Sequence, residues 1–200
     1  LMREQRLREL ERLLREHGLL PLSETRILDV GCGRGGWLAD FEAWGAQRAR
    51  LAGLDLSEAR VASARELLPG ADIRVGSGTE LPWPDASFDL VVQATVFTSI
   101  LSDEMRRAVA AEMSRVLAPG GAVLWYDFFR DNPRNPDVRK VTAAEIAELF
   151  PGFRAELKRI TLAPPLLRRL AGRARPLAVA FERLRVLNTH YLGLLRRVAP

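Results

Sequence analysis

The chain has 200 residues, of which 48% are hydrophobic and 28% charged, as is usual for one globular domain with a substantial core. No apolar run is long enough to span a bilayer and no secretory signal opens the chain, so we expect a cytoplasmic protein. The single cysteine, Cys32, excludes an internal disulfide and argues against structural zinc, and we expect no metal. Because the sequence opens on Leu1 rather than methionine, we expect a few residues upstream.

The net charge of +5 is unevenly distributed along the chain. Residues 151–200 carry ten arginines and one lysine against two glutamates, a net charge of +9, whereas residues 1–150 have a net charge of −4. A basic region of this kind attracts an anionic acceptor, RNA or a membrane surface. Nearly all of the basic residues are arginines, however, which favours a compositional habit of the source genome as the explanation.

The hydrophobic pattern predicts that helices and strands alternate. Residues 2–17 form an amphipathic helix whose apolar stripe includes Leu10 and Leu14, and Gly18 ends it. Strands are expected at residues 26–30, 49–54, 72–75, 88–94, 122–128, 153–162 and 190–197, and helices at residues 36–44, 57–68, 102–117 and 142–150. Residues 119–121, Pro-Gly-Gly, are expected to form a turn.

This alternation predicts a single α/β domain over residues 1–200, built as a three-layer α/β/α sandwich around a mostly parallel, seven-stranded sheet. The last strand is expected to be antiparallel. Residues 163–187 interrupt the pattern with a Pro-Pro pair and helical sequence between the last two strands. We expect them to form a cap at the carboxyl edge of the sheet, where open α/β sheets bind ligands.

Residues 27–36 read ILDVGCGRGG, a strand that leads through glycines into a helix. Such a turn lets a ligand approach bare backbone and directs free N–H groups toward it. The spacing alone fits two cofactors. Gly31, Gly33 and Gly36 match the dinucleotide pattern G-x-G-x-x-G, whereas Gly31, Gly33 and Gly35 match the G-x-G-x-G spacing found with S-adenosylmethionine.

Two carboxylates and the chain length favour the second cofactor. Asp29 precedes the first glycine by two residues, where it would face an ammonium group and repel a pyrophosphate. Asp55 ends the next strand, in position to accept ribose hydroxyls. The chain is also too short for a dinucleotide domain plus a substrate domain. Each carboxylate has a structural alternative, since Asp29 is also suited to cap a turn and Asp55 to cap a helix.

Further motifs complete a family pattern: GLDLS at residues 53–57, LPWPDASFDLVV at 81–92 and RVLAPGG at 115–121. With the glycine loop, they make the chain resemble the class I S-adenosylmethionine-dependent methyltransferases of the small-molecule type over residues 25–130. The resemblance implies a Rossmann-like, cofactor-binding core, S-adenosylmethionine as cofactor and S-adenosylhomocysteine as product.

The resemblance also implies cofactor contacts, position by position. Asp55 would hold the ribose hydroxyls and Leu56 would pack on the adenine. The contacts to the methionine part would come from Asp29, Gly31, Cys32, Gly33 and Gly35, with Gln93 at the same end. Gly78 and Thr79 would border the adenine edge. Many relatives have an acidic residue close by, but Ser77 stands at the matching position here.

Catalytic candidates are sought where the strands end at the ligand edge. Methyl transfer from a sulfonium is an in-line displacement, so positioning contributes most of the rate and a base matters only when the acceptor loses a proton. Tyr126 or Asp127 should point toward the acceptor, although Asp127 has an alternative role in pairing with Arg130 or Arg134. His190 opens the last predicted strand, and its ordinary pKa of about 6.5 suits a general base, although a structural role is the alternative.

The leading function is methyl transfer to an oxygen or nitrogen atom of a small-molecule acceptor. Methylation of RNA through the basic C-terminal region is an alternative, although the sequence contains no appended RNA-binding module and a nucleic-acid partner is not expected. A cofactor-binding protein without catalytic activity is another, and a dehydrogenase is the last. The helix over residues 2–17 is expected either to cover the cofactor site as a lid or to pair with a partner.

Overall fold

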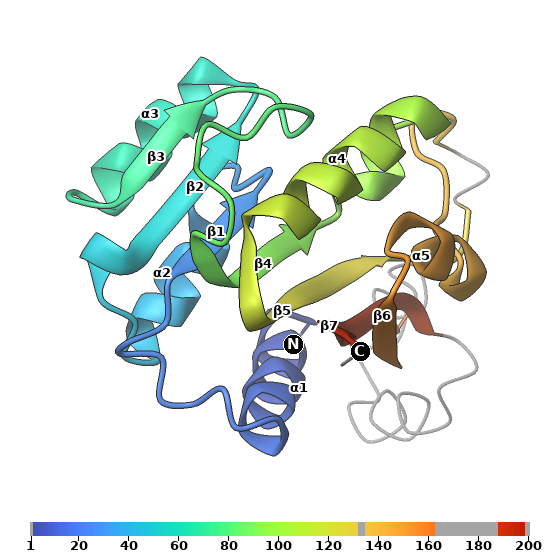
Figure 1. The fold of residues 1–200 in the computed structure, drawn as a ribbon, viewed down its shortest axis with the longest axis horizontal. Helices are drawn as coiled ribbons and strands as arrows, with labels where there is room; N and C mark the ends of the chain where they lie inside the picture. The colour runs from blue at the N-terminus through green and yellow to red at the C-terminus, as the bar shows by residue number, and fades with distance from the viewer. Residues whose placement is uncertain (1, 132–134, 163–187, 199–200) are drawn as a thin grey trace, which may run out of the picture.

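The computed structural model describes residues 2–131, 135–162 and 188–198. Seven strands form one sheet in the order β3-β2-β1-β4-β5-β7-β6 (Figure 1). They are β1 (Ile27–Val30), β2 (Leu51–Asp55), β3 (Asp72–Val75), β4 (Phe88–Ala94), β5 (Leu117–Phe128), β6 (Phe153–Leu162) and β7 (Asn188–Arg197). The pairs from β3 to β5 are parallel, and β7 is antiparallel to both β5 and β6. The predicted sheet is therefore confirmed, while the predicted cap at 163–187 lies outside the described residues.

Helices cover both faces of the sheet, as the three-layer prediction requires (Figure 1). The helices α1 (Met2–Glu16), α2 (Gly36–Ala43) and α3 (Glu58–Leu67) share a hydrophobic core on one face, which we call the α1 face. The helices α4 (Asp103–Val116) and α5 (Ala143–Leu149) pack on the opposite α4 face. No helix within the described ranges is long and apolar enough to cross a membrane.

The helix α1 is attached to the domain at both of its ends. Leu10 and Leu14 are fully buried in the core, as the predicted apolar stripe requires. Asp40 of α2 pairs with Arg3 and Arg6 at one end. At the other end Lys158 lies 2.7 Å from Glu16 and Arg196 donates to the His17 carbonyl at 2.9 Å. The helix therefore packs along the α1 face, from α2 to the β6 and β7 strands.

The order of the strands creates a switch point between β1 and β4. The chain winds from β1 outward through β2 and β3, then crosses back to start β4 on the other side of β1. In open α/β sheets the ligand crevice lies outside the carboxyl ends of the strands at such a point. β1 and β2 are buried along their whole length, so the chain is fixed up to the residue where each strand ends.

Three boundaries differ from the prediction by two residues or more. Residues 119–121 form a bulge rather than a turn, because Leu117 already pairs with Phe88 while Ala122 pairs with Leu90. β2 begins at Leu51 because residues 48–50 form a 3₁₀ turn. β7 begins at Asn188, two residues earlier than expected, since its backbone already pairs with the end of β6. His190 is therefore the third residue of the last strand, not the first.

The close approach of β7 to β6 at Gly193 gives the first testable prediction. A Cβ at this position would lie 2.1 Å from the carbonyl oxygen of Glu156, so Gly193→Ala must push the two strands apart. We expect it to lower the free energy of unfolding by about 1–3 kcal/mol, the usual cost of overpacking. Urea denaturation followed by circular dichroism measures the change. Gly36→Ala is the control, since a Cβ there meets nothing within 4 Å. Equal stabilities of the two variants would contradict the prediction.

Candidate cofactor site

A cleft of about 680 Å³ opens at the carboxyl ends of β1, β2 and β4. Its walls come from those strand ends, the loop after β3, the segment after β4 and the first turns of α4. Five of the residues predicted to bind cofactor line this cleft: Gly31, Asp55, Leu56, Gly78 and Thr79. The cleft thus lies at the place where the strand order predicts a ligand crevice.

The glycine loop is tied to the end of β2 by its backbone. The N–H groups of Gly31 and Cys32 both donate to the Leu54 carbonyl, at 2.7 and 3.0 Å. Gly31 has a φ of +74°, and a Cβ there would lie 2.5 Å from a methyl group of Val96, so only glycine fits. Beside Gly33, by contrast, a Cβ would meet nothing within 4 Å. The loop therefore leaves open space against bare backbone, as a ligand cradle requires.

Two further residues of the loop pack inward and do not line the cleft. Cys32 is buried with its sulfur against Gly53 of β2, and burial raises the pKa of its thiol above the ordinary value. Gly35 packs against Ala64 and Leu68, at the end of α3. These residues shape the loop, and the thiol stays neutral.

The carboxylate of Asp55 is held by the backbone at the mouth of the cleft. One oxygen accepts from the Gly33 N–H and the other from the Ser57 N–H, each at 2.9 Å. The cap of α3 is Ser57, which accepts from the N–H of Arg60, so the alternative role of Asp55 as helix cap is wrong. Each carboxylate oxygen retains acceptor capacity, so the pair suits two neighbouring hydroxyl groups.

Exposed apolar side chains line the same cleft. Leu56 is 74% exposed, Leu101 54% and Met105 47%. Large apolar side chains left in water at a cleft mark a surface that a ligand covers. The pattern suits the flat ring of a nucleobase. Leu101 and Met105 were not predicted, because they follow β4 in a segment without a motif.

The loop after β3 satisfies its own hydroxyl groups. The oxygens of Ser77 and Thr79 lie 2.7 Å apart, and the Thr79 N–H donates to the Ser77 hydroxyl at 3.2 Å. At the position where many relatives have an acidic residue, this chain therefore has the hydroxyl of Ser77, which is paired with Thr79. Both residues line the cleft beside Gly78.

Asp29 does not line the cleft itself, but it is the least satisfied polar group beside the glycine loop. It is 1% exposed, and neither carboxylate oxygen has a hydrogen-bond partner. Burial and the negative charge of Asp55 raise its pKa to about 8, while the positive charge of Arg6 opposes the shift. A cap would accept an N–H, so the cap alternative is wrong. A buried carboxylate without a partner is costly, and a ligand ammonium group would relieve that cost.

Gln93 and Asp29 lie on adjacent strands but point to opposite faces of the sheet. Gln93 pairs in register with Val30, whose side chain belongs to the α4 face, whereas Asp29 points to the α1 face. The Gln93 side-chain oxygen accepts from the Val96 N–H at 3.3 Å, and its buried nitrogen has no partner. Gln93 thus supports the segment that follows β4.

The turn after β4 holds a residue in an unfavourable conformation. Thr95 has a φ of +60°, which is rare for a β-branched side chain. Its N–H donates to the Tyr126 carbonyl at 2.8 Å and its hydroxyl to the Ala94 carbonyl at 2.6 Å. Backbone of this kind clusters at functional sites, and Thr95 lines the cleft.

Two of the three catalytic candidates come together on the α1 face. The rings of Tyr126 and His190 are stacked, with centroids 4.7 Å apart and planes at 12°. Phe128 lies 3.9 Å from the His190 ring, and Trp37, which follows the glycine loop, lies 5.4 Å from Tyr126. We call Trp37, Tyr126, Phe128 and His190 the aromatic wall.

His190 is poorly suited to act as a strong base. It is 5% exposed, and its Nδ1 lies 2.9 Å from the Thr189 hydroxyl. Burial and the positive charge of Arg6 lower its pKa to about 4. The imidazole is therefore neutral at neutral pH and holds a proton less readily than a free histidine.

Asp127 lies on the opposite face of the sheet, and its carboxyl oxygens accept hydrogen bonds from neighbouring residues of the protein. It is fully buried, and its oxygens accept from the hydroxyl and N–H of Thr98, at 2.6 and 3.2 Å, and from the Phe128 N–H at 2.8 Å. Burial raises its pKa to about 6, against the effect of these hydrogen bonds. The hydrogen bonds favour a structural role, with Thr98 rather than an arginine as partner. Arg134 lies outside the described residues.

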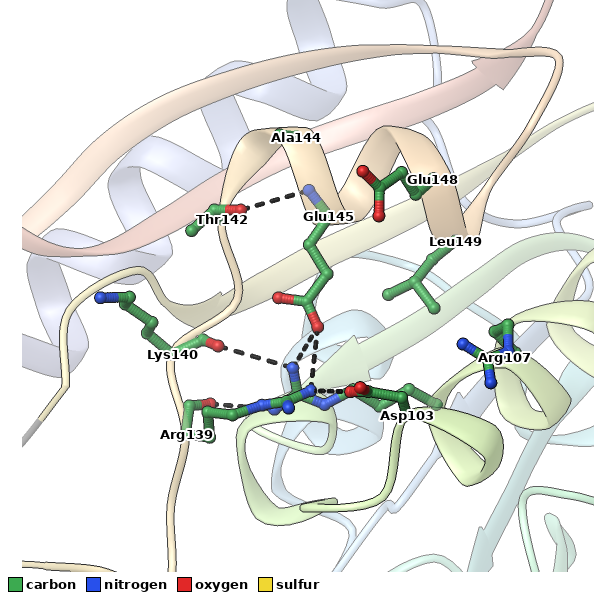
Figure 2. A pocket seen from close by; sticks show the side chains of 10 residues that line it. Asp103, Arg107, Arg139, Lys140, Thr142, Ala144, Glu145, Glu148 and Leu149 are labelled. Atoms are coloured by element: carbon green, nitrogen blue, oxygen red, sulfur yellow. Dashed lines mark hydrogen bonds and ion pairs between the residues drawn. The ribbon is translucent and has the colours of Figure 1, made fainter.

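A second cavity, of about 440 Å³, lies between α4 and α5 (Figure 2). In Figure 2 the carboxylates of Glu145 and Asp103 point to a common centre with Arg139. There the fully buried Arg106 pairs with Glu145 and donates to the carbonyls of Ile100 and Arg139 at 2.7 and 3.1 Å. This network joins α4 to the segment before α5. The cavity contains none of the predicted site residues.

Comparison with known proteins agrees with the geometry. A family model described as "Methyltransferase domain" matches residues 27–121. A probable S-adenosylmethionine-dependent methyltransferase of Mycolicibacterium smegmatis is 40% identical over 140 residues, which are 65% of this chain and 52% of that protein. A demethylmenaquinone methyltransferase of Listeria welshimeri is 33% identical over 134 residues, 64% of this chain and 55% of that protein. The chain thus spans about half the length of these curated relatives.

The fold is also that of solved methyltransferases. An S-adenosylmethionine-dependent methyltransferase from Mesorhizobium loti superimposes with a TM-score of 0.63 over 90% of this chain and 95% of that one, at 21% identity. With the glycine loop and the strand order, these matches support a class I S-adenosylmethionine-dependent methyltransferase domain over residues 27–121. The cofactor of this class is S-adenosylmethionine.

The buried carboxyl of Asp29 gives a pH-dependent prediction. Its pKa is about 8 in the folded chain and about 3.9 in an unfolded one. Between those values the folded state holds a proton that the unfolded state has released, so stability falls as pH rises, by up to about 1.4 kcal/mol per pH unit. Asp29→Asn removes this contribution, and its stability relative to the natural chain should increase from pH 5 to pH 8. Urea denaturation at several pH values measures it.

The control for this prediction is Asp85→Asn, which removes a carboxyl that is 78% exposed. Its stability should follow that of the natural chain across the same pH range. If Asp29→Asn also runs parallel to the natural chain, the carboxyl of Asp29 does not hold its proton in the folded state.

Proposed function

We propose that the chain binds S-adenosylmethionine in this cleft and transfers its methyl group to an oxygen or nitrogen atom of a small-molecule acceptor. The observation that carries the proposal is the carboxylate of Asp29, buried without a hydrogen-bond partner beside the glycine loop. S-adenosylmethionine supplies an ammonium group for it and an electrophilic methyl group on a sulfonium. The contribution of the protein is then to bind and orient the two reactants.

Each part of the site suits one part of this cofactor. Asp29 would accept from the ammonium group, and Asp55 would accept from the two ribose hydroxyls with the oxygens that the backbone holds in place. Leu56 and Met105 would flank the adenine. The open space beside Gly33 would admit the chain that joins ribose and amino acid. Gly78 and Thr79 would border the adenine, with the hydroxyls of the loop in place of an acidic residue.

The aromatic wall supports an acceptor that carries a flat, apolar group. Tyr126 and His190 lie on the same face of the sheet as Asp29, and Trp37 directly follows the glycine loop. Aromatic side chains bind flat rings by offset stacking. One relative is named for demethylmenaquinone and another, from Mycobacterium ulcerans, for phthiotriol and phenolphthiotriol dimycocerosates, so those names do not agree on one acceptor.

Within this proposal His190 positions the acceptor and does not remove its proton. A neutral imidazole with a pKa of about 4 is a weak base, and its Nδ1 is already within hydrogen-bond distance of Thr189. Asp127 orients the segment after β4 through Thr98. Tyr126 presents its ring between Trp37 and His190. The acceptor would therefore arrive with a nucleophilic atom that needs little activation.

Calorimetric titration with S-adenosylhomocysteine tests the cofactor half of the proposal. We expect the natural chain to bind it and not to bind NAD. Asp55→Asn should weaken binding by about tenfold or more, because hydrogen bonds to a charged acceptor contribute about 1.5–3 kcal/mol. Asp85→Asn, at an exposed residue outside the cleft lining, is the matched control and should bind normally.

Incubation with S-adenosylmethionine and a panel of acceptors, with RNA as one member, tests the other half. Methylation of small molecules, detected by mass spectrometry, is the expected result. Methylation of RNA alone would favour the alternative of an RNA methyltransferase. Cofactor binding without methylation of any acceptor would favour a binding protein without catalytic activity.

Substitution of His190 separates positioning from base catalysis. His190→Phe keeps a flat ring against Tyr126 and should retain most of the turnover. His190→Ala should lose about two- to tenfold, the value of one stacked aromatic pair. A general base contributes about 100- to 10,000-fold, so a loss of that size in both variants would identify His190 as the base. Steady-state turnover on one acceptor measures the difference.

A further inference from the structure

Arg6, a cation of α1, stacks on the aromatic wall, on the same face of the sheet as the buried carboxyl group of Asp29. The guanidinium carbon of Arg6 lies 4.4 Å from the centre of the Trp37 ring and 5.9 Å from that of Tyr126. Its positive charge lowers the pKa of both Asp29 and His190. The Arg6 side chain is 20% exposed. It therefore lies on the α1 face, next to the start of α2 and the glycine loop.

The hydrogen-bonding capacity of Arg6 is only partly used. One terminal nitrogen donates to Asp40 at 3.2 Å, while its buried Nε has no partner. A guanidinium has five N–H donors in a planar fork that matches a carboxylate. Stacking on Trp37 holds the plane of this fork in place, so little side-chain entropy is lost when it binds an anion.

The amino-acid end of the cofactor needs more than the ammonium partner that Asp29 provides. Once Asp29 has ionised to pair with that ammonium group, the α-carboxylate of the cofactor would enter a region that already contains two carboxylates, those of Asp29 and Asp55. A cation must balance that charge, since buried ions are stable only when paired. Arg6 is the cation that acts on Asp29. Two other arginines are exposed: Arg34, in the glycine loop itself, and Arg60, which lines the cleft 4.0 Å from the Asp55 carboxylate and is 62% exposed.

We propose that Arg6 binds the α-carboxylate of the cofactor while Asp29 binds its α-ammonium group, so that α1 completes the methionine end of the site. This inference rests on the proposed function, because it assumes that the amino-acid end of the cofactor lies beside the glycine loop. It assigns the first helix to the cofactor site itself and not to an interface with a partner.

A pair of ligands tests this role. S-adenosylhomocysteine carries the amino-acid end and 5′-methylthioadenosine lacks it, while both carry adenine and ribose. Arg6→Met should weaken binding of S-adenosylhomocysteine by about tenfold or more, as expected for charged hydrogen bonds, and should change binding of 5′-methylthioadenosine by less than about twofold. Titration calorimetry of both ligands measures the two affinities.

Arg3→Met is the matched control. Arg3 is on the same helix and pairs with the same Asp40, but it is 71% exposed and contributes no charge effect to Asp29. This variant should bind both ligands normally. Arg6→Lys, which keeps the charge and loses the planar fork, should fall between the natural chain and Arg6→Met. It also provides the test if Arg6→Met does not fold.

Several outcomes would overturn the proposal. Equal weakening of both ligands by Arg6→Met would mean that Arg6 only holds α1 in place. Unchanged binding of S-adenosylhomocysteine with a raised KM for the acceptor would assign Arg6 to the acceptor. Loss of affinity in Arg34→Met and not in Arg6→Met would assign the carboxylate to the loop arginine. If the natural chain binds neither nucleoside, the proposed function itself fails.

Discussion

The attachment of the glycine loop to the end of β2 is the interaction on which the site depends. One carbonyl, that of Leu54, accepts two N–H groups of the loop, and the next residue, Asp55, accepts a third from Gly33. Because β1 and β2 are buried along their whole length, the positions of the glycine loop after β1 and of Leu54 and Asp55 in β2 are fixed by the core. As a result, the loop does not close over the strand ends, and the cleft remains open between β2 and the turn after β4.

The same attachment concentrates negative charge. It brings the carboxyl groups of Asp29 and Asp55 close together, and burial and the negative charge of Asp55 raise the pKa of Asp29 to about 8. The positive charge of Arg6 opposes this shift. Arg6 is held on the same face by its ion pair with Asp40 of α2 and by the Trp37 ring. A cofactor with both an ammonium group and a carboxylate would complete the balance. Cofactor binding and the docking of α1 against the domain would then be linked, since each would stabilise the other.

Much of the fold could be predicted from the sequence, because buried parallel strands and capped helices leave local patterns. Boundaries failed where long-range pairing decides: residues 119–121 look like a turn, yet the backbone of Gly121 approaches the Asp89 carbonyl within a bulge of β5. In the site, Gly31 and Asp55 follow from a motif. Leu101 and Met105, which line the cleft, do not follow from a motif, and neither does the stacking of Arg6 on Trp37, since tertiary packing brings these side chains together from different elements.

Burial also changes what the candidate catalytic residues can do. When only its ordinary pKa is known, a histidine at a strand end suggests a general base. The sequence does not reveal which aromatic rings will pack around that histidine in the fold. Between Tyr126 and Phe128 the imidazole of His190 loses water and becomes harder to protonate. Asp127, which is also buried, lies on the other face of the sheet and accepts a hydrogen bond from the Thr98 hydroxyl. These surroundings are the reason why we propose that His190 orients the acceptor and that Asp127 orients the segment after β4, and that neither removes a proton.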